Sequence, residues 1–391
     1  MKFYIYNAGT CIRVKLFGED VRNLLKLNGW NECSVAAIAD YLIINTCSFL
    51  ESKSSYFLEF IQIIEKQRLL FQKIVVIGCL GGTHEKEILA ISKDILIFKR
   101  DLDVIACSFK CDQMPKATAT NISETLPLSK MILEKFNRCF LHSKHIEFRL
   151  KREHVCYIQM STGCLGKCTY CSEKFITKLK SRPIKEILDA VDDGIKRGFT
   201  LFSLSSDDAS AYGKDIGSSL DELLMELCKI KQNIYFIIPE FNPQGLSESV
   251  IKSLSDKKFL YITIPIQSGS QKILNKMKRP YEIDKVVKDV CRIKNSNKHL
   301  MVNTHVIVGF PGETDEDFEK TRMLLKTGLF DRVKVFMYSE RPGTKAALFP
   351  DKVSQTIKEN RRQKILKTMR HSNLKKMSLT NLILNLEQIK E

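Results

Sequence analysis

Three cysteines in the middle of the chain, Cys164, Cys168 and Cys171, follow the spacing C-x3-C-x2-C. Thiolates at this spacing can bind three irons of a [4Fe–4S] cube, and the fourth iron then stays open for a small chelating ligand. A structural zinc site is one alternative, but zinc favours paired C-x2-C groups, and no second C-x2-C occurs in the chain. Buried free thiols are the other. Cysteine number and spacing favour a cluster, and Gly163 and Gly166 would let the backbone wrap closely around it.

The composition is that of a soluble globular protein of two or three domains, with 391 residues, 44% of them hydrophobic and 27% charged. No apolar run reaches the ~18 residues that span a bilayer, so no membrane partner is expected. The start of the chain reads as a strand and not as a signal peptide. Thirteen cysteines without a secretion signal indicate a reducing, cytoplasmic location, where thiols serve metals or chemistry; disulfides are the weaker interpretation.

The net charge of +17 is unevenly distributed, because residues 351–391 carry ten Lys or Arg against four Asp or Glu. A basic tail indicates a polyanionic partner, most simply nucleic acid. The alternative is that a Lys-rich chain merely has solvated basic faces.

Strand-like and helix-like segments alternate in the N-terminal third. Phe3–Ala8, Tyr41–Asn45 and Lys73–Gly78 are predicted strands, the last being the clearest because β-branched residues end at a glycine. Glu19–Asn28 and Ser52–Phe71 are predicted amphipathic helices. This alternation predicts a parallel sheet with helices packed on it.

Three cysteines come just after strand segments in this part of the chain: Cys11, Cys47 and Cys79. Ligands of open α/β sheets gather at the carboxyl ends of strands, so these thiols could meet although they are far apart in sequence. Spacing alone does not establish a meeting, and three unrelated buried cysteines are the alternative.

About six β/α units are predicted after the C-x3-C-x2-C loop. Polar and glycine-rich motifs follow the strands, where glycines allow close approach to a cofactor and carboxylates and amides can bind its polar groups. The predicted strands are Val155–Met160, Thr200–Leu204, Ile234–Ile238, Tyr261–Ile266, Val302–Val308 and Asp331–Met337. The predicted helices are Pro183–Gly198, Leu220–Lys231, Leu246–Leu254, Ile283–Ile293 and Asp315–Thr327, the last capped by Thr314. The motifs are Ser205–Gly217, Asn242-Pro243, Pro265–Ser270 with Met277–Arg279, Val306–Thr314 and Tyr338–Thr344.

The cysteine motif, with Tyr170 before its last cysteine, resembles that of the radical S-adenosylmethionine (SAM) enzymes, and the motifs after the strands follow that family's order. The N-terminal third resembles the first domain of the methylthiotransferases, in which three cysteines bind a second [4Fe–4S] cluster. Cys11, Cys47 and Cys79 stand at the matching positions. Thr10 replaces the usual glycine before Cys11, and Val14 replaces an asparagine.

The resemblance implies an α/β fold with an N-terminal parallel-sheet domain and a partial (β/α)6 radical SAM barrel, whose catalytic groups lie at the carboxyl ends of strands. We expect the N-terminal domain over residues 1–115, a linker over 116–150, the barrel over 151–350 and a basic helical tail over 351–391. Cys107, Cys111 and Cys139 match no ligand position and are interpreted as spare thiols.

Among the methylthiotransferases, Gly163–Cys171, Ala211–Gly217 and Phe241–Pro243 look most like the archaeal and eukaryotic branch, which acts on N6-threonylcarbamoyladenosine beside the tRNA anticodon. The family's Arg-Gly after the cluster loop is absent here, where Ile176–Lys180 stands instead. The usual C-terminal RNA-binding barrel (TRAM domain) is also expected to be absent, because only about 20 residues follow Arg370.

The resemblance implies two [4Fe–4S] clusters and SAM as cofactors. Cys164, Cys168 and Cys171 would hold the radical cluster, which cleaves SAM to generate a radical that takes hydrogen from an unactivated C–H bond. The second cluster would supply the sulfur, and a second SAM the methyl group. A reductase or a flavodoxin-type protein is the expected electron donor. The residues assigned to the SAM pocket are Tyr170, Ser206, Asp208, Gln267 and Gly309. Candidates to bind a substrate phosphate or carboxylate, with surface ion pairing as the alternative, are Lys278, Arg279 and Arg341.

The leading hypothesis is methylthiolation of a threonylcarbamoyl- or isopentenyl-type adenosine next to the tRNA anticodon, with the basic charge as the deciding feature. The alternative is the same chemistry on a protein or a ribosomally made peptide. The expected lack of a TRAM domain supports this alternative. A catalytically silent iron–sulfur protein and a radical SAM enzyme without sulfur insertion are the remaining hypotheses.

Overall fold

The computed structural model describes residues 1–7, 11–48, 51–120 and 155–369. The chain forms two compact units, one made of Met1–Leu165 with Ser172–Asp207 and the other of Gly166–Cys171 with Asp208–Glu391. Most of the expected linker, Cys139 and the tail beyond residue 369 lie outside the described residues. Among the described residues, no helix combines the length and the apolar character needed to cross a membrane.

The first unit contains a five-stranded parallel sheet in the order β2-β1-β3-β4-β5. In a doubly wound sheet of this order, the point at which the connections change direction lies between β1 and β3, and ligands bind outside the carboxyl ends of the strands there. The strands are β1 (Lys2–Tyr6), β2 (Asn31–Glu32), β3 (Tyr41–Thr46), β4 (Lys73–Gly78) and β5 (Leu96–Phe98).

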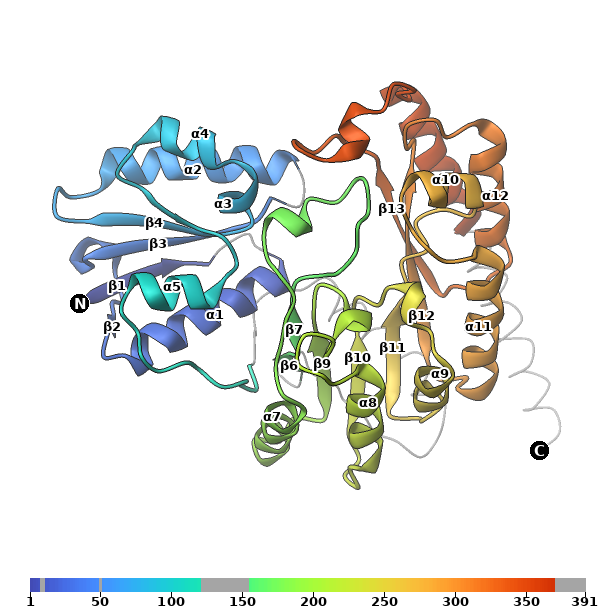
Figure 1. The fold of residues 1–391 in the computed structure, drawn as a ribbon, viewed down its shortest axis with the longest axis horizontal. Coiled ribbons are helices and arrows are strands. Elements are labelled where there is room, and N and C mark those ends of the chain that lie inside the picture. Colours follow the sequence, from blue (N-terminus) through green and yellow to red (C-terminus); the bar gives the residue numbers. More distant parts are fainter. Residues whose placement is uncertain (8–10, 49–50, 121–154, 370–391) are drawn as a thin grey trace, which may run out of the picture. The chain divides into compact units, whose positions relative to one another are not determined.

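Helices cover both faces of this sheet (Figure 1). Because side chains alternate along a strand, Ile43 of β3 packs with the helices on one face while Leu42 and Ile44 pack with those on the other. On the Ile43 face lie α1 (Ile12–Leu27) and α5 (Leu102–Ser108), and on the opposite face α2 (Glu51–Gln67), α3 (Leu80–Thr83) and α4 (Glu85–Ile91). The prediction of a parallel sheet with packed helices is confirmed.

Helix α1 begins seven positions earlier than predicted, at Ile12 instead of Glu19. Gly18 is a poor helix former, and it hid the apolar spacing that continues on either side of it. The structure gives a reason for this glycine: a Cβ there would lie 2.5 Å from Nδ2 of Asn45. Gly18 therefore makes room for a side chain from the neighbouring strand.

The second sheet has six strands in the order β13-β12-β11-β10-β9-β6, and the strand pairs β6/β9, β10/β11, β11/β12 and β12/β13 are parallel. Neighbours in space are thus neighbours in the chain, as expected of repeated β/α units, and the predicted α/β fold class is confirmed. The strands are β6 (Val155–Gln159), β9 (Leu201–Ser205), β10 (Tyr235–Ile238), β11 (Phe259–Thr263), β12 (Met301–Val308) and β13 (Arg332–Met337).

The connecting helices fall close to their predicted positions, except for α10, which was not predicted. Thr314 caps α12 through a capping box, in which its hydroxyl accepts from the Asp317 amide and the Asp317 carboxylate accepts from the Thr314 amide. The helices are α7 (Ile184–Lys196), α8 (Leu220–Lys229), α9 (Glu248–Leu254), α10 (Gln271–Lys276), α11 (Ile283–Ser296) and α12 (Asp315–Lys326). Residues 355–369 are also helical.

Candidate functional site

Three cysteines of the first unit meet at the carboxyl edge of the five-stranded sheet. Cys11 caps the N-terminus of α1, Cys47 directly follows β3, and Cys79 directly follows β4. A hydrogen bond from Cys47 lowers the pKa of the Cys11 thiol well below its usual value. Burial raises the pKa of Cys79 to about 12, and the charge of Cys11 contributes to that rise. The structure thus brings together three thiols that sequence spacing alone could not place.

The residues before Cys47 tie the three cysteine-bearing loops to one another. Asn45 donates from Nδ2 to Oδ1 of Asn7 (2.6 Å) and to the carbonyl of Val14 (2.7 Å), on either side of Cys11. Thr46 donates from its hydroxyl to the carbonyl of Ile77 (2.6 Å) and accepts from the amide of Leu80 (3.3 Å), on either side of Cys79. These buried bonds fix the spacing of the thiols.

Gly78 makes the closest approach between these loops possible. Its φ of 101° lies in the left-handed region, and a Cβ there would lie 2.4 Å from the carbonyl oxygen of Thr46. Any side chain at this position would push β4 away from β3 at the point where Cys47 and Cys79 leave the sheet.

A buried charge network lies beside the three thiols in the same unit. Asp207 accepts from Nη1 of Arg13 (2.9 Å), from Nη2 of Arg100 (2.7 Å) and from the backbone amide of Gly163 (2.6 Å). Arg100 also pairs with Glu173. Burial favours a protonated Asp207, but the two guanidinium groups hold its pKa below its usual value. The network connects the start of the Cys164 loop to the surroundings of Cys11 and Cys79.

The sequence analysis did not find this network. Asp207 stands between two residues assigned to the SAM pocket, so its position was a partial signal. Arg100 follows the short strand β5 in no recognisable motif and is 107 residues away from Asp207 in the chain. Only the folded structure brings these residues together.

The C-x3-C-x2-C loop lies between two short strands, β7 (Ser161–Thr162) and β8 (Lys180–Ser181), which pair antiparallel. Gly163 has a φ of 79°, and a Cβ there would lie 2.2 Å from the carbonyl oxygen of Lys178, so the base of the loop requires glycine. Cys168 is buried, whereas Cys164 and Cys171 are partly exposed. None of the three forms a disulfide.

The part of the loop that belongs to the second unit is held through Thr169, which is 2% exposed. Its amide donates to the carbonyl of Met277 (3.0 Å), its hydroxyl to the carbonyl of Lys276 (3.0 Å), and its carbonyl accepts from the amide of Ala346 (2.9 Å). Three bonds to one buried residue fix the backbone between Cys168 and Tyr170.

Arg279 lies in the same region and donates from Nη1 to Sγ of Cys168 (3.5 Å). It is 7% exposed. Of the three residues predicted to bind a substrate anion, only Lys278 is exposed and Arg341 partly exposed. The structure therefore places Arg279 against a candidate cluster ligand, in a setting different from the one predicted.

The residues assigned to the SAM pocket differ in how far their polar atoms are engaged. Asp208 caps a short 3-10 helix, accepting from the amide (3.0 Å) and hydroxyl (2.7 Å) of Ser210 and from the amide of Asn242 (3.3 Å). Tyr170 packs edge-to-face on Phe310. Asp208 thus has a structural task that is independent of any ligand.

Gly309 has its amide engaged as well. The amide donates to Oε2 of Glu313 (2.6 Å), and its φ is 70°. A Cβ there would lie 2.3 Å from Cγ of Lys358, which belongs to the helical residues 355–369. This glycine is required for helix packing, whether or not a cofactor approaches it.

Other polar atoms at the strand ends remain unsatisfied. Within the described residues, the hydroxyls of Ser205, the last residue of β9, and of Ser206 are buried without a hydrogen-bond partner, and so is Oε1 of Gln159 at the end of β6. In the second unit the same holds for Oε1 of Gln267. Buried polar atoms are normally paired, so these are the atoms that a polar ligand such as SAM would satisfy. The residues present therefore fit such a ligand.

No three His, Cys, Asp or Glu side chains of the described residues converge where one metal ion would be bound.

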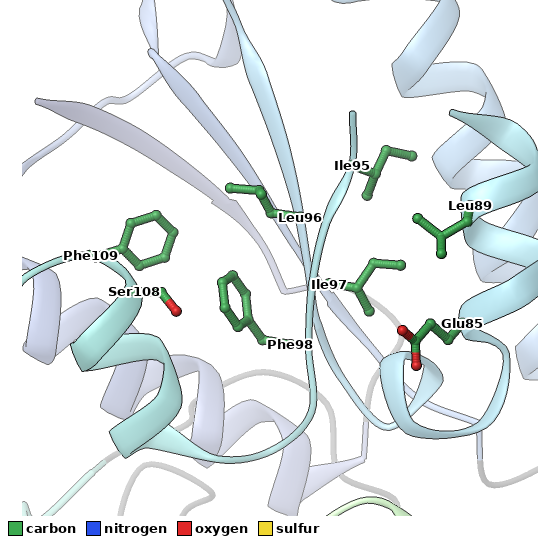
Figure 2. A pocket seen from close by; sticks show the side chains of 8 residues that line it. All are labelled: Glu85, Leu89, Ile95, Leu96, Ile97, Phe98, Ser108 and Phe109. Carbon is green, nitrogen blue, oxygen red and sulfur yellow. The ribbon is translucent and has the colours of Figure 1, made fainter. Parts of the chain in front are cut away.

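A cavity of about 440 Å³ lies elsewhere in the first unit, beside the edge strand β5 (Figure 2). Six of its eight lining residues are apolar and none is a cysteine, so it offers no thiolate for an iron–sulfur cluster. It is lined by Glu85, Leu89, Ile95, Leu96, Ile97, Phe98, Ser108 and Phe109.

Comparison with known families gives two matches. The radical SAM superfamily matches residues 158–325, which contain Cys164, Cys168 and Cys171. The "Uncharacterized protein family UPF0004" matches residues 3–98, which contain Cys11, Cys47 and Cys79. The two matched regions together make up more than half of the chain.

Curated relatives fall into two groups by name. The ribosomal protein uS12 methylthiotransferase RimO of Chlamydia felis is 27% identical over 386 residues, covering 96% of this chain and 80% of that protein. A probable threonylcarbamoyladenosine tRNA methylthiotransferase of Archaeoglobus fulgidus is 29% identical over 350 residues, covering 88% of this chain and 78% of that protein.

Solved structures show the likeness of the fold. The radical SAM methyltransferase TsrM of Kitasatospora setae, with cobalamin and a [4Fe–4S] cluster bound, has a TM-score of 0.63 and 12% sequence identity. The alignment covers 89% of this chain and 77% of that one.

Proposed function

Since the chain belongs to the radical SAM methylthiotransferase family, we propose that it inserts sulfur into an unactivated C–H bond of a modified adenosine beside the tRNA anticodon and methylates that sulfur. The convergence of Cys11, Cys47 and Cys79 is the observation that carries this proposal. Three converging thiols are what a second, sulfur-supplying [4Fe–4S] cluster requires.

We assign the second [4Fe–4S] cluster to these three thiols. Cys11 lies at a helix N-terminus, where the backbone dipoles favour the thiolate, which is the form that binds iron. Asn45 and Thr46 hold the three loops at fixed spacing, and the guanidinium groups of Arg13 and Arg100 help to lower the pKa of Cys11, which favours its thiolate.

We assign the radical cluster to Cys164, Cys168 and Cys171, with SAM beside it. When bound, the cluster and SAM supply the one-electron chemistry that breaks the C–H bond. The protein's part is to orient these groups: Thr169 fixes the loop between two of the cysteines, and the unsatisfied oxygens of Ser206 and Gln267 would accept hydrogen bonds from SAM. Tyr170, Asp208 and Gly309 would shape its pocket.

The basic charge supports tRNA as the substrate. A net charge of +17 favours a polyanion, and the Archaeoglobus fulgidus relative is named for a tRNA activity. Lys278 and Arg341, at the ends of α10 and β13, are the side chains proposed to hold an RNA phosphate or a carboxylate of the modified base. The second candidate is ribosomal protein uS12, and it is favoured by the names of the relatives from Chlamydia felis and Geotalea uraniireducens.

The test is anaerobic reconstitution of the full chain followed by incubation with SAM, a reductant and either bulk tRNA or uS12. We expect about eight irons per chain, as two cubes require, and a methylthio-adenosine by mass spectrometry of the digested tRNA. Methylthiolated uS12 with unmodified tRNA would transfer the activity to the protein substrate. Iron for a single cube would refute the two-cluster mechanism.

A matched pair of cysteine variants localises the second cluster. Cys47→Ala should lose about four irons and the methylthio product but still cleave SAM. Cys107→Ala removes an exposed thiol outside both groups and should keep all eight irons. Equal iron content in the two variants would contradict the assignment of Cys47.

A further inference from the structure

Three arginines are buried in the described part of the chain: Arg100, Arg279 and Arg361. Arg100 is paired with Asp207 and Glu173, and Arg361 is paired with Glu313 and Asp315. Burying a guanidinium is expensive unless a negative charge compensates it, and these two follow the rule.

Arg279 differs from the other two because no carboxylate among the described residues lies within ion-pair distance of it. Its side chain donates to Sγ of Cys168 (3.5 Å), to the carbonyl of Pro265 (3.0 Å) and to the hydroxyl of Tyr281 (3.3 Å). Among these partners, only the sulfur of Cys168 would carry negative charge, as a thiolate ligand of the cluster. The fold therefore contains a buried cation whose counter-charge must come from the cysteine or from what the cysteine binds.

The backbone conformation before Arg279 directs its side chain toward Sγ of Cys168. Helix α10 ends at Lys276, and Lys278 takes a left-handed conformation with a φ of 53°, which is unfavourable for a residue other than glycine. This turn reverses the chain and directs Arg279 inward. The same turn accepts both hydrogen bonds from Thr169, so it holds two successive residues of the cluster loop, Cys168 and Thr169.

Tyr281 fixes the guanidinium from the other side. Its hydroxyl accepts from Nε of Arg279 and donates to the carbonyl of Ile266 (2.8 Å). With Pro265 and Ile266 in adjacent positions after β11, the arginine is anchored to the strand end as well as to the loop. The hydrogen bonds to Cys168, Pro265 and Tyr281 therefore hold the guanidinium in one orientation.

We propose that Arg279 is the counter-ion of the radical cluster, donating an N–H to the Cys168 thiolate and raising the cluster's reduction potential. This inference rests on the proposed function, since it takes Cys168 as a cluster ligand. The potential of an iron–sulfur cluster depends on its net charge and on hydrogen bonds to its sulfurs. A buried positive charge beside a ligand sulfur stabilises the reduced cluster, which carries one more negative charge, more than the oxidised one.

The test is a redox titration of the reconstituted full chain, without substrate, monitored by electron paramagnetic resonance. The radical cluster is identified as the signal that changes when SAM is added. Arg279→Gln keeps an N–H donor but removes the charge. We expect it to shift the equilibrium toward the oxidised cluster by about tenfold or more, which is 59 mV for a one-electron couple. Arg279→Lys keeps the charge and should recover part of the shift.

Lys278→Gln is the matched control, because it removes the same charge from the adjacent, exposed position and should leave the potential nearly unchanged. Iron and sulfide content show whether each variant still assembles its clusters. Equal shifts for Arg279→Gln and Lys278→Gln, or no shift in either, would overturn the counter-ion role. Failure of the unaltered chain to assemble a SAM-sensitive cluster would instead contradict the proposed function.

Discussion

Asp207→Asn tests the contribution of the buried charge network beside Cys11 and Cys79 to stability. Asp207 receives three donors on two carboxylate oxygens, from Arg13, Arg100 and the amide of Gly163. Asparagine keeps the shape, but it retains only one acceptor oxygen and adds an N–H₂ group that would face other donors. The substitution therefore removes the negative charge and leaves two arginines competing for one oxygen.

The size of the effect follows from burial. Removal of one partner from a buried ion pair costs about 3–5 kcal/mol, because the remaining charge is left uncompensated. In the variant, Glu173 still pairs with Arg100 and compensates part of the charge of this arginine. We therefore expect a loss of stability at the lower end of this range, about 3 kcal/mol. For a unit of roughly 200 residues this corresponds to a fall of about 6–12 °C in Tm.

The assay is differential scanning calorimetry of the full-length apo-protein. Asp189→Asn is the matched control, because Asp189 pairs with Lys185 on the surface of α7 in the same unit, with side chains that are 64% and 85% exposed. Such a pair is worth less than about 1 kcal/mol. If Asp207→Asn lowers Tm by no more than Asp189→Asn does, the network is not a stabilising feature and the argument from burial fails.

Three further predictions concern single positions. Thr46→Val removes the bonds to β4 and α3 and should cost about 1–3 kcal/mol while lowering the iron content of the reconstituted chain by up to one cube, measured by iron analysis. Gly163→Ala should reduce the iron retained by the radical site, because its Cβ would overlap the carbonyl of Lys178; an unchanged iron content would show that the loop relaxes freely. Burial raises the pKa of Glu313 from 4.5 to about 7, so the folded state binds more protons than the unfolded state between these values, and stability falls by about 3 kcal/mol as pH rises through them. Glu313→Gln should abolish this part of the pH dependence of Tm between pH 5 and 8, and a variant with the slope of the unaltered chain would contradict the assignment.

The regular elements could be predicted from sequence where local signals agree. The strand at Lys73–Gly78 was predicted correctly to the residue, because a run of β-branched residues ends at a glycine. Helix α1 was predicted too short, because Gly18 is a poor helix former that the close approach of Asn45 requires. Tertiary packing determines which residue type fits such a position, and a local sequence pattern cannot reveal that constraint.

The residues of the candidate site also differ in whether the sequence could predict their role. Cys164, Cys168 and Cys171 could be proposed from spacing, since one short loop carries them all. The meeting of Cys11 with Cys47 could be inferred only through the family resemblance, because it depends on the order of strands in the sheet. Arg279 follows Lys278 in a polar turn and therefore resembled a surface anion binder. Its burial depends on the left-handed turn at Lys278, which no sequence pattern predicts.

The placement of buried charge distinguishes the two cysteine groups. Beside Cys11 and Cys79, the positive charges of Arg13 and Arg100 are balanced by Asp207 and Glu173, so the network adds no net charge to its surroundings. Beside Cys168, Arg279 contributes one positive charge that no carboxylate of the described residues balances. Two cubes with the same number of thiolates would thus experience different potentials, and the cube at Cys168 should accept an electron more readily. That order suits the proposed chemistry, in which the electron must reach the cluster that activates SAM and not the one that supplies sulfur.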